Sequence, residues 1–209
     1  MTSHTSSSYV LEMKTVQIAP MRTLMTALKD ILLETNIVFS KDYVDSKGNT
    51  VPAGIRIINM DKSHTILAHL FLDALKFEHF YCKYPKIVIG VNMFHLFKLI
   101  NTIDNDDTLT IYIEEKDYSD GIVEYLGLKF ENGDIKQMKI QKLKLIEPDE
   151  EELDMPSVKF SSIINLPATD FQKIIRDLSN ISERLEIKSI GIYSKPLTCF
   201  KKIIRVGIS

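Results

Sequence analysis

The feature that most constrains the fold of this chain is an amphipathic helical pattern that occurs three times at nearly equal spacing. In each occurrence, apolar residues recur every three or four positions. The pattern occupies residues 20–34, 92–103 and 169–181. Counted from Met21 to Phe94 and from Phe94 to Phe171, the segments are 73 and 77 residues apart. That period is too long for a solenoid and indicates one supersecondary block that is used several times.

Helix-start signals accompany the three segments. Pro20 suits the first turn of a helix, because its missing N–H has no partner there. Asn92 is a good N-cap for the second helix, and Thr169 or Asp170 is the expected cap of the third. We therefore predict three helices that begin close to these residues.

Runs with strand character fill the intervals between the helices. They alternate polar with apolar residues or are rich in β-branched and aromatic side chains. The runs are Ile55–Asn59, Thr65–Leu72, Phe77–Tyr81, Lys86–Ile89, Leu109–Glu114, Ile122–Phe130 and Ile135–Leu145. Asn132-Gly133 is a strong hairpin signal, and 45–50 is a polar loop that reads as an insertion between two strands. The chain is thus predicted to be an α+β protein, with each helix followed by several antiparallel strands.

The order of these elements predicts two domains of unequal completeness. Residues 10–145 hold two helix-plus-strands units and form a complete first domain, preceded by a polar leader at 1–9 that we expect to be disordered. An acidic connector at 146–159 contains Pro148 and Pro156. Residues 160–209 open with a strand at Phe160–Leu166 and then hold only one helix, so they are predicted to form a partial second domain.

Charge is distributed unevenly along the chain, although the formal net charge is only -2. The segment Glu147–Asp154 contains six acidic residues and no basic one, which leaves 22 of the 28 acids against 26 bases elsewhere. An acidic strip beside a mildly basic body suits a protein that turns one face toward phosphate. The alternative is that Glu147–Asp154 is simply a solvated linker.

Composition and motifs argue against several other classes of protein. A mean hydropathy of -0.02 and the absence of an apolar run of about 18 residues argue against a membrane-spanning helix. The only cysteines, Cys82 and Cys199, lack metal-site spacing and favour a reducing compartment. His79 near Cys82 makes a poor zinc site without a second pair of ligands. No serine or cysteine lies in a nucleophile motif, and we predict neither an enzyme nor a bound metal or cofactor.

Five stretches, in order, resemble landmarks of the proliferating cell nuclear antigen family, the eukaryotic and viral type of DNA sliding clamp. They are Val16-Gln17 with the helix ending Ala27–Asp30, Gly54–His64, Ile89–Asn92, Leu166-Pro167, and Arg176–Ser179. The resemblance covers roughly residues 10–190. It implies the DNA-clamp fold and a ring-shaped homotrimer, with strands outside and helices around a central hole that holds duplex DNA.

The resemblance also implies which basic residues face the DNA. Family members carry DNA-facing bases on these helices, at positions that correspond to Arg22, Lys29, Lys98, Lys173 and Arg176. Such residues would act on the phosphate backbone without reading the base sequence. Without the resemblance, these five residues would read as ordinary solvated helix faces.

A partner-binding groove is implied beside the connector, where family members hold a short apolar and aromatic segment of each client protein. The corresponding positions are Met60, His64, Thr65, Leu67, Leu153, Met155 and Pro156. Thr65 replaces the usual valine and makes that wall more polar. On the sequence alone, His64 next to Ser63 is equally a turn residue that satisfies backbone groups.

The end of the chain departs from the family pattern. From about residue 191 onward nothing resembles a clamp, and the family subunit continues further. The chain therefore reads as truncated or frame-altered, or as a divergent relative whose tail supplies a substitute strand. In family rings, a second-domain strand pairs with the first-domain edge of the next subunit, expected here at about Lys136–Leu143. Three lysines in this range, Lys136, Lys139 and Lys142, together with Lys144 directly after it, discourage random pairing.

Function and partners follow from the resemblance. The leading hypothesis is a processivity factor that tethers DNA polymerase and other replication and repair proteins to duplex DNA and is opened by a clamp loader. The alternative is a regulatory clamp relative or fragment that binds client peptides without closing a homotrimeric ring. The resemblance implies the nucleus, or a viral replication site, as the location, and no membrane partner.

Overall fold

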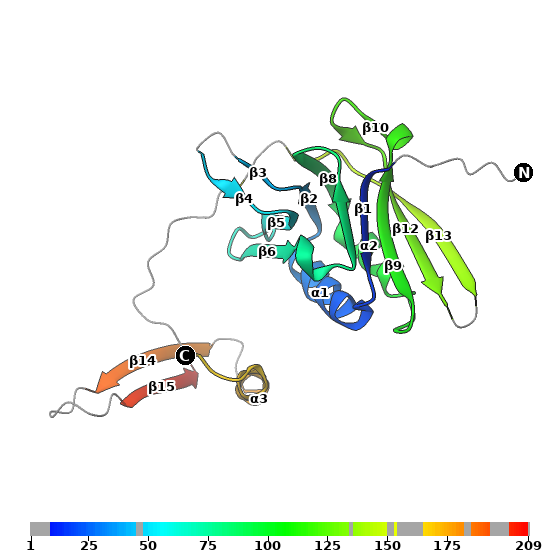
Figure 1. The fold of residues 1–209 in the computed structure, drawn as a ribbon. Coiled ribbons are helices and arrows are strands. Elements are labelled where there is room, and N and C mark those ends of the chain that lie inside the picture. The colour runs from blue at the N-terminus through cyan, green and yellow to red at the C-terminus, as the bar shows by residue number, and fades with distance from the viewer. Residues whose placement is uncertain are drawn as a thin grey trace, which may run out of the picture. The chain divides into compact units, whose positions relative to one another are not determined.

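The computed structural model describes residues 9–44, 48–133, 136–149, 153, 165–181, 185–192 and 201–208. The chain divides into two compact units, Met1–Met155 and Pro156–Ser209 (Figure 1). The predicted leader lies outside the described residues, except that Tyr9 already belongs to the first strand. Most of the predicted connector and of the strand at Phe160–Leu166 also lies outside them, so these predictions stay open.

The larger sheet of the first unit has five antiparallel strands in the order β13-β12-β9-β1-β7. Their bounds are β1 Tyr9–Thr15, β7 His79–Cys82, β9 Thr108–Glu114, β12 Tyr125–Asn132 and β13 Gln137–Lys144. β13 is the edge strand and pairs only with β12 among the described residues. The prediction of an edge strand near Lys136–Leu143 is therefore confirmed.

The second sheet of this unit has four antiparallel strands in the order β6-β5-β2-β8. Their bounds are β2 Glu34–Ser40, β5 Gly54–Met60, β6 Leu67–Asp73 and β8 Lys86–Asn92. Two short ladders lie beside the sheets, β3 (Tyr43–Val44) with β4 (Thr50–Val51), and β10 (Tyr118–Ser119) with β11 (Ile122–Val123). Single 3₁₀ turns occur at Ala74–Lys76 and Glu115–Asp117.

The predicted strand positions are confirmed with shifted ends. The run predicted at Ile122–Phe130 is two strands, β11 and β12, which are separated at Glu124, where the backbone N–H donates to Asp117 O at 3.0 Å. The β12–β13 hairpin forms where Asn132-Gly133 predicted one. However, Asn132 is not a turn residue but the last paired residue of β12. Its side-chain amide donates to Asp107 Oδ1 at 2.8 Å.

Helix α1 (Ile18–Ile31) begins two residues before Pro20 and ends three residues before the predicted end at Glu34. It ends early because Leu32 adopts an extended conformation and is buried at 2% exposure, so the chain turns into the core there. Its cap residue Gln17 makes no side-chain capping bond.

Helix α2 (Met93–Ile100) starts as predicted, because the side chain of Asn92 accepts a hydrogen bond from the His95 N–H at 3.1 Å. It ends three residues short of the predicted Ile103. The following turn is held by Asp107, whose Oδ2 accepts from the Asp104 N–H at 3.1 Å. The acidic residues after α2 therefore form a helix-to-strand turn.

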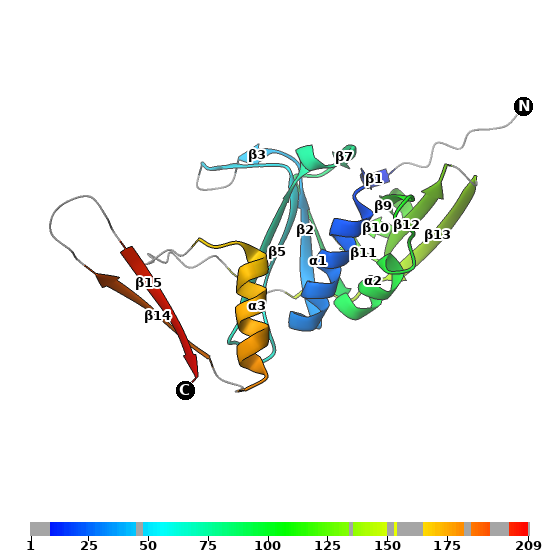
Figure 2. The same cartoon turned by 90° about the horizontal axis from the view of Figure 1, so that it is seen from below.

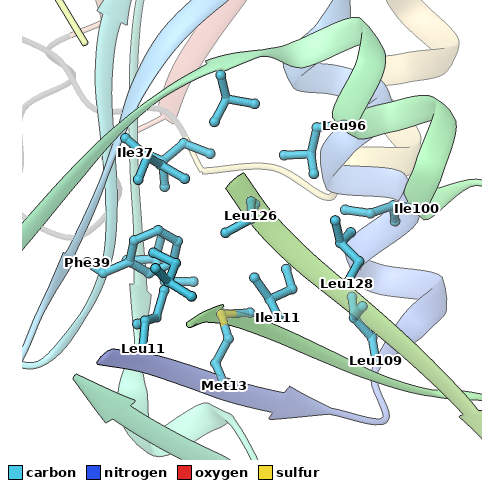
Figure 3. Packing of buried hydrophobic residues seen from close by; sticks show 14 of the residues in the cluster. Leu11, Met13, Ile37, Phe39, Leu96, Ile100, Leu109, Ile111, Leu126 and Leu128 are labelled. Atoms are coloured by element: carbon cyan, nitrogen blue, oxygen red, sulfur yellow. The ribbon is translucent and has the colours of Figure 1, made fainter. Parts of the chain in front are cut away.

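One hydrophobic core joins both sheets to α1 and α2 (Figure 3). Strand residues two positions apart point to the same face, and the strands therefore contribute buried side chains in pairs such as Leu11 with Met13 and Leu109 with Ile111. Those labelled in Figure 3 are Leu11, Met13, Ile37, Phe39, Leu96, Ile100, Leu109, Ile111, Leu126 and Leu128. Each such burial contributes about 1.5–3 kcal/mol. The packed core leaves the opposite faces of the sheets and helices to carry function.

The second unit contains α3 (Ala168–Ser179) and an antiparallel hairpin of β14 (Leu185–Ile192) with β15 (Lys201–Ile208). The predicted cap of α3 was wrong. Thr169 and Asp170 lie inside the helix, and the cap residue is Pro167, which makes no side-chain bond. Proline at this point ends the extended segment and begins the helix because its φ is already near the helical value.

The tail of the chain contributes a strand, which the sequence did not predict in a defined place. β15 pairs with β14 over eight residues, from Leu185 opposite Ile208 to Ile192 opposite Lys201. In this unit, as after α1 in the first, a helix is followed by antiparallel strands, although β3 and β4 intervene between β2 and β5.

Candidate functional site

The outward face of the β6-β5-β2-β8 sheet is the first candidate surface. Inward residues of its strands, such as Ile57 and Ile89, are buried in the core. The alternate residues Val38, Ile58 and Val88 are half-buried on the outward face. Strand periodicity of two explains this division. The outward face is therefore an apolar floor that is covered only in part.

The connector crosses this floor. The Ile146 N–H donates to Gly90 O at 3.1 Å. Asn36 forms two hydrogen bonds with the backbone of Asp149: the Asn36 Nδ2 donates to Asp149 O at 2.7 Å, and the Asn36 Oδ1 accepts from the Asp149 N–H at 2.9 Å. A Cβ on Gly90 would lie 2.6 Å from Ile146 O and 2.8 Å from Glu147 O. Only glycine allows the connector to approach β8 this closely.

A small hollow of about 140 Å³, which we call the Met60 hollow, lies beside the connector. Its lining residues are Asn36, Ile58, Asn59, Met60, His64, Asp149 and Leu153. The structure thus brings together Met60, His64 and Leu153, three of the residues predicted to bind partner segments. Sequence reasoning missed the others. Ile58 follows from the alternation that includes Met60, whereas Asn36 carried no signal of its own.

Of the other predicted groove residues, Leu67 lies opposite Met60 in the β5–β6 pairing but does not line the hollow. Thr65 is turned toward Asp61, to which its backbone N–H donates at 2.8 Å. Met155 and Pro156 lie outside the described residues. The partner-binding assignment of all seven residues remains a prediction.

The turn that carries His64 is organised by one carboxylate. Asp61 accepts hydrogen bonds from the N–H groups of Ser63, Thr65 and Ile66 at 3.2, 2.8 and 2.7 Å, and also from the Ser63 hydroxyl. The Ser63 hydroxyl bond, followed by the Ile66 N–H, holds the pKa of this carboxyl well below its usual range. His64 has a φ of 55°, and its N–H donates to Asp61 O at 2.9 Å. His64 is therefore a turn residue that also lines the Met60 hollow, and it is Asp61 that satisfies the backbone N–H groups of the turn.

A second and larger hollow of about 550 Å³, which we call the hairpin hollow, lies between the β3–β4 ladder and the connector. Its lining residues are Asn36, Val38, Tyr43, Val51, Arg56, Ile58, Lys86, Val88, Ile122, Glu147, Pro148, Asp149 and Leu153. The two short strands that flank the polar loop at 45–50, β3 and β4, therefore build a wall here through Tyr43 and Val51. Nothing in the local sequence indicated this, because the wall exists only where the ladder faces the connector.

The packed helices α1 and α2 form the second candidate surface of the first unit (Figure 2). Lys98 is exposed and lies 4.4 Å from the centre of the Phe94 ring. Lys29 is half-buried, with its Nζ 5.0 Å from the centre of the Phe97 ring and an ion pair to Asp30. Both lysines retain access to solvent.

Arg22 is placed differently from the other predicted DNA-facing residues. Its guanidinium donates to Asn105 Oδ1 at 3.2 Å and to Ile103 O, and it lies half-buried against the turn after α2. Among the described residues, its Nε is buried without a hydrogen-bond partner. This arginine therefore braces the two helices in addition to carrying a positive charge.

On α3, Lys173 and Arg176 are exposed, as are Asp170 and Asp177. The helix contains two acidic and two basic residues, with Asp170 in its first turn and Arg176 in its last, so its formal net charge is zero. No residue of α3 is buried, and Phe171 and Ile174 are 41% and 37% exposed on its apolar stripe. The stripe is thus available for packing against another surface.

The edge strand β13 is the third candidate surface. Met138 and Ile140 are 58% and 55% exposed on it. The Lys142 ammonium group donates to Asp117 Oδ2 at 2.7 Å and also pairs with Glu114. Both hydrogen bonds raise the pKa of Lys142, and the bond to Asp117 has the larger effect. The edge thus combines exposed backbone, two apolar side chains and a lysine held on its own sheet.

Among the described residues, no group of three histidine, cysteine or acidic side chains is placed to hold a metal ion, and no helix has the length and apolar character to cross a membrane. Cys82 is buried, whereas His79, three residues before it on β7, is exposed. Residues three apart on a strand point to opposite faces, so these two do not form a joint site.

The fold is that of a DNA clamp. A crystal structure of proliferating cellular nuclear antigen from Entamoeba histolytica superposes with a TM-score of 0.72, covering 97% of this chain and 78% of that one at 21% identity. Sequence comparison adds the family. The family model of the proliferating cell nuclear antigen N-terminal domain matches residues 10–152, and that of the C-terminal domain matches residues 154–192. The chain belongs to the proliferating cell nuclear antigen family.

Two curated relatives agree with this assignment. A probable DNA polymerase sliding clamp 1 of Paramecium bursaria Chlorella virus 1 is 30% identical over 182 residues, which are 87% of this chain and 63% of the relative. A proliferating cell nuclear antigen of Chaetomium thermophilum is 29% identical over 180 residues, which are 86% of this chain and 62% of the relative. The chain therefore spans less than two thirds of the length of these relatives.

Proposed function

We propose that this protein is a DNA sliding clamp, a processivity factor that encircles duplex DNA and tethers DNA polymerase and other replication and repair proteins. The observation that carries the proposal is the exposed edge strand β13 in a chain of this family. A ring needs a strand edge on each subunit with which the next subunit pairs, and head-to-tail contacts of this kind close into rings. Met138 and Ile140 would be buried by that pairing.

The contact with DNA would use charge alone. Arg22, Lys29 and Lys98 on the first unit and Lys173 and Arg176 on α3 are proposed to lie near phosphates and to let the ring slide. Lys98 is the clearest member because it is exposed and its amine has no carboxylate partner among the described residues. Loss of one phosphate contact reduces the salt slope of DNA binding by about 0.9. Lys98→Glu is expected to reduce it by at least that much.

Client proteins would bind at the Met60 hollow with an apolar or aromatic side chain between Met60, His64 and Leu153. Thr65, in the turn, and Leu67, on the neighbouring strand β6, would contact the client segment beside the Met60 hollow. Met155 and Pro156 would extend the wall along the connector. A clamp loader would open the ring, and the nucleus or a viral replication site would be the place of action.

The test of the ring is the native mass in solution, measured by light scattering on a sizing column. Three copies of the 24.0 kDa chain amount to about 72 kDa. That mass, together with retention on circular but not on linear DNA, supports the sliding clamp. A particle of about 24 kDa at low and moderate salt overturns the homotrimeric ring. It leaves the alternative of a regulatory relative or fragment that binds client peptides, for which binding at the Met60 hollow is the remaining measurement.

A further inference from the structure

The Met60 hollow and the hairpin hollow lie side by side. Four residues line both of them: Asn36, Ile58, Asp149 and Leu153. The Met60 hollow alone, at about 140 Å³, is smaller than the roughly 300–1,000 Å³ typical of ligand pockets, whereas the hairpin hollow at about 550 Å³ falls inside that range. A segment anchored at Met60 would therefore find most of the available space on the side of the β3–β4 ladder.

The hairpin hollow is lined by two basic residues, Arg56 and Lys86, and by two acidic ones, Glu147 and Asp149. Arg56 donates from Nη1 to the Ser40 hydroxyl and from Nη2 to Pro52 O, both at 2.7 Å. Within the described part of the chain, it takes part in none of the ion pairs. Its guanidinium lies 4.6 Å from the centre of the Phe71 ring, and desolvation lowers its pKa. These bonds hold the guanidinium in place, so an incoming carboxylate would meet a positioned partner.

We propose that the client segment continues from the Met60 hollow into the hairpin hollow and carries an acidic side chain that pairs with Arg56. This inference rests on the proposed client binding and names the chemistry of the client. Val38 and Val88 form the apolar floor under the extension, and Tyr43 and Val51 form its outer wall.

The spacing within the client follows from strand geometry. Met60 and Arg56 lie four residues apart on β5, which is about 13 Å at roughly 3.3 Å per residue. An extended peptide covers a similar distance per residue. The acidic residue is therefore expected about four positions from the apolar anchor, on the same side of the extended segment.

The experiment uses the full chain and a displayed library of random peptides of about 16 residues, long enough at roughly 3.3 Å per residue to span both hollows. A selected peptide is synthesised in full, in a form shortened to its apolar anchor, and with its acidic residue changed to the amide. Fluorescence anisotropy gives the dissociation constants. The full peptide is expected to bind about tenfold more tightly than the amide form, because a hydrogen bond to a charged group is lost.

Two matched variants change only the wall of the hairpin hollow. Val51→Asp places a negative charge beside the proposed acidic residue and Val51→Lys places a positive one, on a short ladder away from the core. The aspartate variant is expected to weaken the full peptide severalfold and the lysine variant to leave it equal or tighter. The shortened peptide is expected to be indifferent to both changes. Arg56→Gln should remove the preference for the acidic form of the peptide.

The outcomes separate this inference from the proposed function. If full and shortened peptides bind equally well, or if the Val51 variants act alike, the acidic extension is wrong while client binding at the Met60 hollow stands. If Met60→Ala leaves both peptides unaffected, or the library yields no binder, the proposed client site itself is wrong.

Discussion

Replacing Gly90 with alanine is the sharpest test of how the connector is held. A Cβ at this position would lie 2.6 Å from Ile146 O, 2.8 Å from Glu147 O and 2.9 Å from the Glu147 carbonyl carbon. All three are backbone atoms, so no side-chain rotation relieves the contact. We expect Gly90→Ala to lift the connector off β8.

The magnitude follows from the bonds that hold the connector. Lifting it breaks the bond from the Ile146 N–H to Gly90 O and the two bonds between Asn36 and Asp149. At about 1 kcal/mol for each hydrogen bond, the loss is about 3 kcal/mol. Alanine in a strand recovers about 0.5–1 kcal/mol relative to glycine. The expected net loss is about 2 kcal/mol in the free energy of unfolding, or roughly 4–8 °C in Tm for a chain of this size.

The assay combines urea denaturation with amide hydrogen exchange. Exchange at the amides of Ile146 and Asp149 is expected to accelerate strongly in Gly90→Ala, and peptide binding at the Met60 hollow is expected to weaken about tenfold because Asp149 and Leu153 leave its wall. Gly133→Ala is the control, since its Cβ would meet no atom within 4 Å. It should leave stability, exchange and binding unchanged.

The reasoning would be refuted if Gly90→Ala matched the parent chain in exchange at both amides. Asn36→Ala provides an independent route, because it removes the two bonds to Asp149 without adding a clash. It is expected to accelerate exchange at Asp149 while leaving Ile146 protected. Equal exchange at Asp149 in this variant and the parent chain would show that the Asn36 bonds do not hold the connector.

Three further predictions concern the turn, the helix cap and the edge. Asp61→Asn should weaken peptide binding severalfold. Because the folded pKa of Asp61 is lowered, its contribution is complete above the ordinary aspartate pKa of about 3.9 and is lost only as pH falls below that value. The ratio of the parent and Asp61→Asn affinities should therefore stay constant between about pH 6 and 8, and a ratio that changes inside that range would contradict this. Asn92→Ala should lower stability by about 1 kcal/mol in a urea titration through loss of the α2 cap, and an unchanged midpoint would contradict the cap. Ile140→Lys should reduce the native mass from about 72 to about 24 kDa without lowering Tm, because the side chain is 55% exposed; an unchanged mass would place the subunit contact elsewhere.

Element positions were predictable where the pattern was local. The Asn92 cap, the β5 and β9 strands and the β12–β13 hairpin follow from side-chain periodicity and from residues within a few positions of each other. Element ends were less predictable. α1 stops at Ile31 because Leu32 is drawn into the core, and the third helix begins at Ala168 after Pro167, although the polar residues that follow suggested a later start.

Some residues of the candidate groove could also be predicted from the sequence, and others could not. Met60, His64 and Leu153 were named from the resemblance, but Asn36 lies 113 positions before Asp149 and carried no signal of a bond to it. The sequence likewise carried no sign that Arg56 lines the same hollow as Tyr43 and Val51, because that hollow depends on where the connector crosses the sheet.

The sequence by itself determined the repeated helix-plus-strands block, the family and the order of the two domains, because periodicity and local motifs depend on neighbouring residues. Only the tertiary structure decided which strand is left at the edge, why Gly90 must be glycine and how two hollows come to lie side by side at Ile58. Those features are contacts between segments far apart in the chain, and no local propensity encodes the place at which such segments meet.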